Sequence, residues 1–402
     1  MDPRVIAVVA LLALVAVEVV LYVLVRSSQR FRESLSRYRV SVEPLAVLVD
    51  VGSGVGPRRL GKLARYSVLT VSAVSVVFSA YMFYSIVINY LSNLIRSLAS
   101  GVGAPPSPMV PLLPGITFGL GLLPPILVAV GIGLAVHEFA HLAVAVVSGV
   151  PVRGWGIGLA VVFPLAYVRV DEERFSREGL EVKTSVLGAG VAANLALALA
   201  SLAVTGLATQ ALYSYVDGPY LVVVGVEEGM PAARAGLEVP SVIVSVNGTR
   251  VDSLEKLREL LNSSLDRETV FEVYTIPLTR GTCEFYKLSS TGKVYTIRRG
   301  LEDVRRYGYR IGVTLAIAPY LFIAQVPDYL LYTYCQLQVL YVVNLSLAII
   351  NSAPLLITDG GKLLTELLRS PKVRAVDRAI QWTTVALTAL VLTIGLSQAL
   401  TH

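Results

Sequence analysis

The chain has 402 residues, of which 54% are hydrophobic and only 15% are charged. Soluble globular proteins carry about 25% charged residues, so the composition excludes an ordinary soluble enzyme. Four long runs contain no Asp, Glu, Lys or Arg: Ser97–Val136, Thr184–Val216, Tyr329–Thr358 and Ala379–Thr401. A spanning helix needs about 20 apolar residues, so these runs predict a polytopic α-helical protein of the lipid bilayer. The net charge of +6 then reflects the membrane topology and does not indicate nucleic-acid binding.

The hydrophobic segments predict about six transmembrane helices. The first, Val5–Val25, is interrupted only by Glu18. It is longer than the apolar core of a signal peptide, about 7–15 residues, and we interpret it as an uncleaved helix. The other predicted spans cover residues 66–95, 124–149, 184–209, 329–368 and 379–400.

The basic residues of the loops predict the orientation. Arg26–Arg65 holds nine Lys and Arg, Ser97–Leu123 none, Gly149–Thr184 five and Lys362–Arg378 five. Short cytoplasmic loops collect basic residues, whereas long domains cross the membrane regardless of charge. We therefore expect a multi-pass cell-membrane protein whose two termini and long insert are extracytoplasmic. The predicted organisation is 1–65 (first helix and basic loop), 66–209 (helices two to four), 210–328 (insert) and 329–402 (last two helices).

The uncharged segment Gly154–Val168 is only 15 residues long, and it contains Pro164. It is too short to span a membrane comfortably. We expect either a strand-rich re-entrant hairpin at the cytoplasmic membrane face or a surface loop with apolar anchors.

The insert has ordinary composition and predicts a small α+β domain over about residues 218–300. Strands are expected at 220–226, 242–246 and 270–274, and helices at 231–237 and 253–261. Asn247-Gly248 predicts a tight turn. The string from MPAARAGL to LEKLRELL resembles the PDZ domain, which binds extended peptide ends at a sheet edge, although Pro240-Ser241 stands where Gly-Asp is usual.

The two cysteines, Cys283 and Cys335, form no CxxC motif. We expect both to be small buried thiols.

Two of the three histidines belong to one motif in the third span, His137-Glu138-Phe139-Ala140-His141. Residues four apart share a helix face, so both imidazoles can bind one zinc ion. Glu138 lies about 100° around the helix. It is therefore placed to act as acid/base toward a water molecule. Ionisable groups inside a membrane are usually functional, which favours this reading over a chance motif.

A catalytic zinc ion needs a third protein ligand. Asp359 is the best candidate, because it is the acid of an otherwise uncharged stretch and lies five residues after Pro354. The alternative is that Asp359 caps the next helix at the membrane interface. Counted along the helices, His141 and Asp359 lie about 12 Å and about 15 Å from the cytoplasmic ends, which predicts a site in the cytoplasmic half of the membrane.

These motifs together resemble those of the site-2 protease family of intramembrane zinc metalloproteases. The motif at 137–141 matches the family's HExxH, and NSAPLLITDGG at 351–361 matches its NxxP…DG element, with the PDZ-like insert between them. Gly188-Ala189-Gly190…Asn194 resembles the GxxxN element, although Val191 replaces the frequent proline and Thr358 replaces a usual Leu. The resemblance implies that His137, His141 and Asp359 bind Zn²⁺ and that Glu138 is the acid/base.

Two asparagines near these motifs, Asn194 and Asn351, allow two readings. They bond neighbouring helices, or they position the substrate or support an oxyanion near the zinc ion.

The leading hypothesis is a protease that cleaves within the transmembrane segment of a membrane-anchored substrate. The resemblance implies a regulatory substrate already trimmed by another protease. The alternatives are a membrane metal-ion transporter, since intramembrane His and Asp also mark ion pathways, and an inactive peptide-binding scaffold. Transporters often contain internal repeats, which this sequence lacks, and the scaffold predicts a decayed Glu138, which is intact.

Overall fold

The computed structural model describes residues 3–58, 60–101, 103–213, 220–262, 265–280, 286–289, 291–318 and 327–401. The chain divides into two compact units. Unit 1 consists of Met1–Ala203 and Gln336–His402, and unit 2 of Val204–Cys335.

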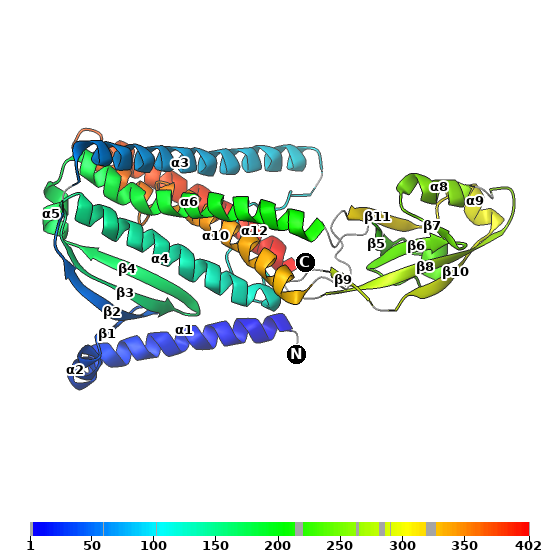
Figure 1. Ribbon diagram of the computed structural model, residues 1–402, viewed down its shortest axis with the longest axis horizontal. Helices are drawn as coiled ribbons and strands as arrows, with labels where there is room; N and C mark the ends of the chain where they lie inside the picture. Colours follow the sequence, from blue (N-terminus) through cyan, green and yellow to red (C-terminus); the bar gives the residue numbers. More distant parts are fainter. Residues whose placement is uncertain are drawn as a thin grey trace. The chain divides into compact units, whose positions relative to one another are not determined.

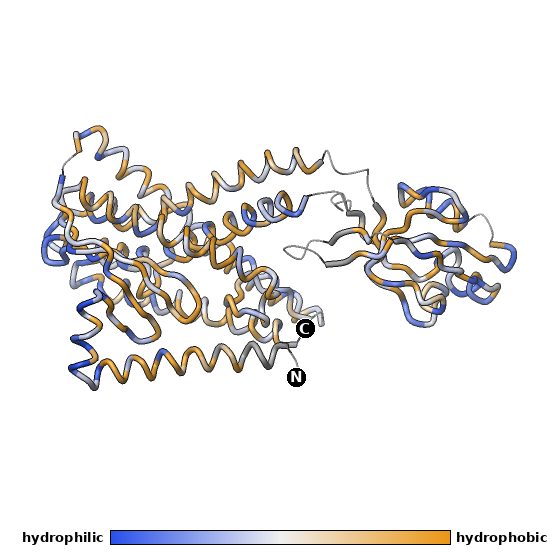
Figure 2. The backbone as a smooth tube through the Cα atoms, turned by 60° about the horizontal axis from the view of Figure 1, so that its bottom comes forward, coloured by the Kyte–Doolittle hydropathy of each residue, from blue (hydrophilic) through white to orange (hydrophobic). Residues whose placement is uncertain are grey.

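Unit 1 is built from long apolar helices (Figures 1 and 2). Its helices are α1 (Pro3–Ser27), α2 (Gln29–Arg37), α3 (Lys62–Ala99), α4 (Leu123–Val147), α5 (Glu172–Arg177), α6 (Leu180–Tyr213), α10 (Asp328–Ser352), α11 (Asp359–Leu367) and α12 (Arg374–Thr401), of which α6 and α10 extend into unit 2. Among the described residues, five helices are long and apolar enough to cross a membrane, or six if α1 and α2 form one bent span. This agrees with the prediction of about six spans.

The predicted fifth span is broken. Helix α10 ends at Ser352, and α11 begins at Asp359, because Pro354 in the connection cannot continue a helix. A bend of 104° also separates α1 from the short, hydrophilic α2. Ser28 lies at this bend and caps α2, since its side chain accepts a hydrogen bond from the Phe31 N–H.

The segment predicted as a hairpin forms strands β3 (Val152–Ala160) and β4 (Phe163–Val170). They belong to an antiparallel sheet of order β1-β2-β3-β4, in which β1 (Val40–Glu43) and β2 (Ala46–Val55) come from the basic loop that follows α1. The sheet lies between α4 and α1 (Figure 1). A Cβ atom on Gly131, in the middle of α4, would lie 3.1 Å from the Pro164 ring. The hairpin therefore runs alongside a spanning helix, which favours the re-entrant alternative over a surface loop.

Unit 2 contains a second antiparallel sheet of order β10-β8-β6-β5-β11. Its strands are β5 (Tyr220–Val226), β6 (Ser241–Val246), β7 (Thr249–Arg250), β8 (Thr269–Arg280), β9 (Tyr286–Leu288), β10 (Lys293–Arg299) and β11 (Val313–Ala318), and its helices are α7 (Pro231–Arg234), α8 (Leu254–Asn262) and α9 (Leu301–Tyr307). Apolar side chains of strands and helices form the main core, which includes Val223, Ile243, Leu257, Phe271 and Ile297, and a smaller cluster lies on the strands alone.

The strands and helices predicted in the insert are confirmed, with β8 longer than expected. The turn at Asn247-Gly248 is confirmed as well, because both residues have a positive φ, 49° and 74°. The expectation of two free thiols is wrong for Cys335, which is disulfide-bonded. Cys283 lies outside the described residues.

Candidate metal centre

Helix α4 brings the two motif histidines together on one face. His137 and His141 are one turn apart, and their Nε2 atoms are separated by 3.0 Å. The ring of His137 is buried, and that of His141 is partly buried. Their imidazole planes lie at 77° to each other. Two neutral imidazoles that converge in this way present their lone pairs to one point.

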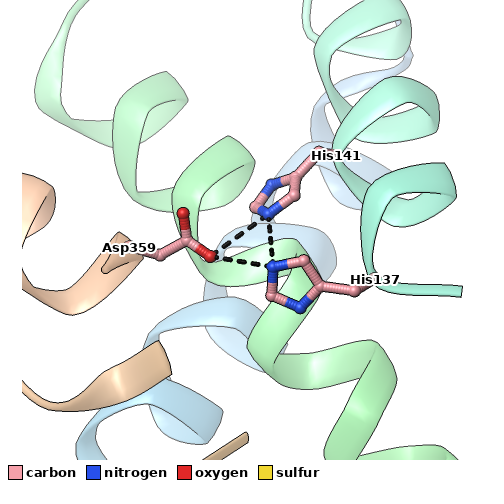
Figure 3. A group of neighbouring side chains, drawn as sticks. All are labelled: His137, His141 and Asp359. Carbon is pink, nitrogen blue, oxygen red and sulfur yellow. Dashed lines mark hydrogen bonds and ion pairs between the residues drawn. The ribbon is translucent and has the colours of Figure 1, made fainter. Parts of the chain in front are cut away.

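Asp359 completes a group of three ligand atoms (Figure 3). Its Oδ2 lies 3.1 Å from His137 Nε2 and 3.2 Å from His141 Nε2. The carboxylate comes from α11, more than 200 residues along the chain from α4. Two imidazole nitrogens and one carboxylate oxygen are a donor set that suits zinc and leave one coordination position open. The side chains therefore fit the metal that the sequence predicts.

The break between α10 and α11 places Asp359 at this point. The Thr358 hydroxyl accepts a hydrogen bond from the Gly361 N–H at 3.2 Å and donates one to the Ala353 carbonyl. Thr358 is thus the N-cap of α11, and Asp359 is its first helical residue. The alternative role of Asp359 as the helix cap is therefore wrong, because Thr358 fills that role and leaves the carboxylate of Asp359 free to face the histidines.

The two glycines after Asp359 allow the first turn of α11 to pack closely against the end of α10 and the connection that follows it. A Cβ atom on Gly360 would overlap the Ser352 carbonyl, and one on Gly361 would overlap the Leu355 carbonyl. Glycine at both positions lets the backbones approach closely. The Asp-Gly-Gly sequence therefore fixes the position of the carboxylate.

The outer nitrogens of both imidazoles have partners on α6. His141 Nδ1 lies 2.7 Å from the Val186 carbonyl oxygen, so it carries the proton and Nε2 is free to bind a metal. His137 Nδ1 lies 3.1 Å from Nδ2 of Asn194, whereas Oδ1 of Asn194 is buried without a partner among the described residues. Amide oxygen and nitrogen are assigned by their hydrogen bonds. Turning this amide over lets Oδ1 accept the Nδ1 proton, which leaves His137 Nε2 free for a metal.

Asn194 therefore lies behind His137, on the ring nitrogen that does not face Asp359. This position suits a residue that orients a ligand, and it does not support the predicted contact with the substrate or an oxyanion. Asn351 is half-buried, and its Nδ2 donates to the Leu347 carbonyl within α10 at 3.1 Å. No hydrogen bond joins Asn351 to the three ligand candidates within the described chain.

Two further residues lie near the site; from the sequence, Gly190 was named only as part of the GxxxN element, and Asn344 was not named. A Cβ atom on Gly190 of α6 would lie 2.5 Å from His141 Nε2 and 2.6 Å from His137 Nδ1, so only glycine leaves room for both rings. Asn344 of α10 is fully buried, and its Oδ1 would lie 2.7 Å from a Cβ atom on Gly133, one turn before His137. The Gly-x-x-x-Asn spacing of Gly190 and Asn194 was a signal for the first, since it places both on one face of α6. For Asn344 the signal was a polar residue inside an apolar span.

Glu138 is adjacent to His137 in α4 but faces a different space. It lines a cavity of about 560 Å³ between α4 and the β3–β4 hairpin. The other lining side chains are mostly apolar, and they include Phe139, Trp155, Ile157 and Tyr167. A carboxyl group on the wall of an apolar cavity, beside three side chains that could hold a metal ion, can transfer protons to or from a molecule that the cavity holds.

The family model of peptidase family M50 matches residues 125–394, a range that includes all three ligand candidates and Glu138. An uncharacterized protein of Methanocaldococcus jannaschii is 26% identical over 215 residues, which are 51% of this chain and 53% of the relative. The chain thus spans about half the length of the curated relative that it matches.

Proposed function

Because the chain belongs to peptidase family M50, the site-2 protease family of membrane metallopeptidases, we propose that it cleaves a peptide bond within the transmembrane segment of a membrane-anchored protein. This proposal rests on the positions of three ligand atoms. His137 Nε2, His141 Nε2 and Asp359 Oδ2 lie within 3.2 Å of one another. Glu138 lies beside them on the wall of an apolar cavity.

His137, His141 and Asp359 would hold Zn²⁺ in this proposal. When bound, the ion supplies Lewis-acid polarisation of the reacting carbonyl and lowers the pKa of a water molecule. The protein contributes the ligand geometry. Val186 and Asn194 hold the imidazoles from behind, and the Thr358 cap holds the helix that carries Asp359.

Glu138 acts as the proton carrier. Its carboxylate accepts a proton from the attacking water as the new C–O bond forms. The same proton then passes to the amide nitrogen as the C–N bond breaks, which yields a carboxylic acid and an amine. This role requires that Glu138 contact the substrate and not bind the metal, and its place on the cavity wall meets that requirement.

The cavity and the hairpin suit an extended substrate segment. A helix hides its carbonyl groups in its own hydrogen bonds, so the substrate has to unwind before it can be cleaved. Strand β4 is an edge strand, and within the described residues it pairs only with β3. An unwound segment can bond to such an edge as an additional strand, beside Glu138. Tyr167 of β4 donates a hydrogen bond to Asp50 of β2 across the small Gly156. This bond links β4 to β2 in the wall of the cavity.

The topology and the insert complete the proposal. The alternation of basic and uncharged loops supports an insert outside the cytoplasm. The disulfide bond of Cys335 supports an extracytoplasmic location of the insert, because disulfides persist mainly in oxidising compartments. We propose that the PDZ-like insert binds peptide ends of substrates that another protease has trimmed. His141 precedes the end of α4 at Val147 by six residues, about 9 Å, which supports a site in the cytoplasmic half of the membrane.

A direct test uses the purified full-length chain in detergent and in liposomes. We expect one zinc ion per chain and cleavage of a single-span substrate that stops with 1,10-phenanthroline and returns with added zinc. Liposomes that take up zinc through the protein, with no cleavage of any single-span substrate, would show a transporter instead.

A further inference from the structure

The first helix carries an acidic residue that the proposed chemistry does not use. Glu18 lies in the otherwise uncharged Val5–Val25 segment of α1. An ionisable residue at this depth is costly and usually has a specific partner. Its partner here is the tip of the β3–β4 hairpin, because Glu18 Oε1 accepts a hydrogen bond from the Val161 N–H at 2.8 Å.

The tip that Glu18 holds is strained. The last ladder pair of the hairpin is Ala160 and Phe163, so Val161 and Val162 form the turn. Val161 has a φ of 57°, a left-handed conformation that is rare for a β-branched residue. Such a conformation is unfavourable and persists only where the surroundings hold it. The carboxylate that binds the Val161 N–H provides such a hold.

The contact does not arise from general packing of α1. Of the α1 side chains that the structure describes, only Val25 is buried. The neighbours of Glu18 are open, with Val17 64% and Val20 56% exposed. Oε2 of Glu18 is nevertheless buried and has no hydrogen-bond partner within the described chain. Burying a carboxyl oxygen without a partner is unfavourable. The hydrogen bond from the Val161 N–H therefore has to offset this cost and stabilise the side chain in its position.

The hairpin tip is connected to the proposed substrate groove. Pro164, three residues after Val161, lies against Gly131 of α4. Trp155, Ala166 and Tyr167 of the same hairpin line the cavity that contains Glu138. A tip that moves away from α4 therefore changes the wall opposite Glu138 and the β4 edge at which a substrate strand would pair.

We propose that Glu18 is a substrate-positioning residue. Through the Val161 N–H it holds the hairpin in the place where the β4 edge aligns an unwound substrate with Glu138. The proposal rests on the proposed function for its effect on cleavage, whereas the mechanical link between Glu18 and the hairpin tip stands independently of it.

The test compares Glu18→Gln, Glu18→Met and Glu18→Ala with the adjacent exposed control Val17→Gln. Gln keeps an acceptor for the Val161 N–H, whereas Met keeps only the length of the side chain and Ala removes it. Loss of one hydrogen bond, about 1.4 kcal/mol, corresponds to roughly a tenfold rise in KM for a single-span substrate. We expect this rise for Met and Ala, with kcat and zinc content unchanged. The Gln and Val17→Gln variants should stay within about twofold of the wild type.

A second readout does not depend on activity. A spin label at Leu159, an exposed residue beside the turn, should be immobile in the wild type and the Gln variant and mobile in the Met and Ala variants. A rigid tip in all variants, a mobile tip with unchanged KM, or a loss of kcat and zinc in place of a KM effect would each overturn the proposal. If the wild type cleaves no single-span substrate, the proposed function fails, and the label still decides whether Glu18 holds the tip.

Discussion

The side-chain amide of Asn194 lies 3.1 Å from Nδ1 of His137, on the opposite side of the imidazole from Asp359. A metal ligand is oriented by the hydrogen bond that its other ring nitrogen makes, and loss of such a partner typically costs 10–100-fold in metal affinity. The packing of α6 against α4 therefore belongs to the proposed metal site as much as the two histidines do.

Asn194→Ala should lower the zinc affinity by about 10–100-fold, because His137 loses the partner that fixes its tautomer and ring orientation. The measurement is competition with a graded series of chelators. Asn351→Ala is the matched control, since the Asn351 amide bonds only to the Leu347 carbonyl in the described structure, and its zinc affinity should stay unchanged. Equal losses in both variants would assign Asn194 a general packing role.

Gly190→Ala should abolish zinc binding and cleavage, because its Cβ atom would lie 2.5 Å from His141 Nε2. Gly206→Ala on the same helix is the control, since nothing lies within 4 Å of its Cβ position. That change should be neutral or stabilise the helix by about 0.5–1 kcal/mol. Zinc content and thermal unfolding of the two variants provide the comparison. Full zinc occupancy in the Gly190 variant would show that α6 does not crowd the histidines.

Lys183→Met should destabilise the protein. Lys183 is 2% exposed, and its Nζ bonds to Glu366 at 2.7 Å and to the Ser176 carbonyl at 2.9 Å. This pair joins the start of α6 to α11, the helix that carries Asp359. Removing one partner of a buried pair costs up to about 3–5 kcal/mol, and the partial exposure of Glu366 reduces this amount. The control is Arg177→Met in the exposed pair Arg177–Glu173. This change should lower the free energy of unfolding by less than about 0.5 kcal/mol. Thermal unfolding should separate the two variants clearly, and equal melting temperatures would contradict the assignment.

Helix α9 in unit 2 should lose protection at acid pH. Burial alone would raise the pKa of Asp303, but hydrogen bonds from Arg234 and the Gly300 N–H outweigh burial and hold this pKa below its usual range. Its contribution to stability is therefore present above the unfolded pKa, about 3.9, and is lost as the pH falls through the lower folded value. The hydrogen-exchange protection factors of residues 301–307 should therefore fall over this pH range in the wild type.

Two variants check the source of that pH dependence. Asp303→Asn removes the titrating group and should flatten the exchange profile of α9, whereas Glu302→Gln alters an exposed neighbour and should leave the profile as it is. An unchanged profile in the Asp303 variant would show that another group controls this helix.

The sequence predicted those parts of the site that lie close together along the chain. His137 and His141 share a helix face by spacing alone. Asp359 could be predicted because it is an acid at a helix break, although the spacing does not show that Thr358, and not Asp359, caps α11. Asn194 was singled out, but its role depends on how α6 packs against α4, which local patterns do not specify.

The β sheet of unit 1 shows the same limit. The hairpin at 154–168 could be predicted from its composition, whereas its pairing with β2 joins residues about 100 positions apart, such as Val49 and Ile157. Short strands in a basic loop carry a weak signal of their own, because their stability comes from the partner strand. The bond between Glu18 and Val161 likewise joins two elements that no periodicity relates.

In the proposed mechanism Glu138 transfers protons while His137, His141 and Asp359 hold the metal. The decisive measurement is the zinc content and the cleavage of a single-span substrate by purified Glu138→Gln, beside His137→Ala. We predict that Glu138→Gln retains one zinc ion and loses cleavage by at least about 100-fold, whereas His137→Ala loses both. Cleavage near the wild-type rate by Glu138→Gln, or a full zinc complement in His137→Ala, would show that these roles are wrong.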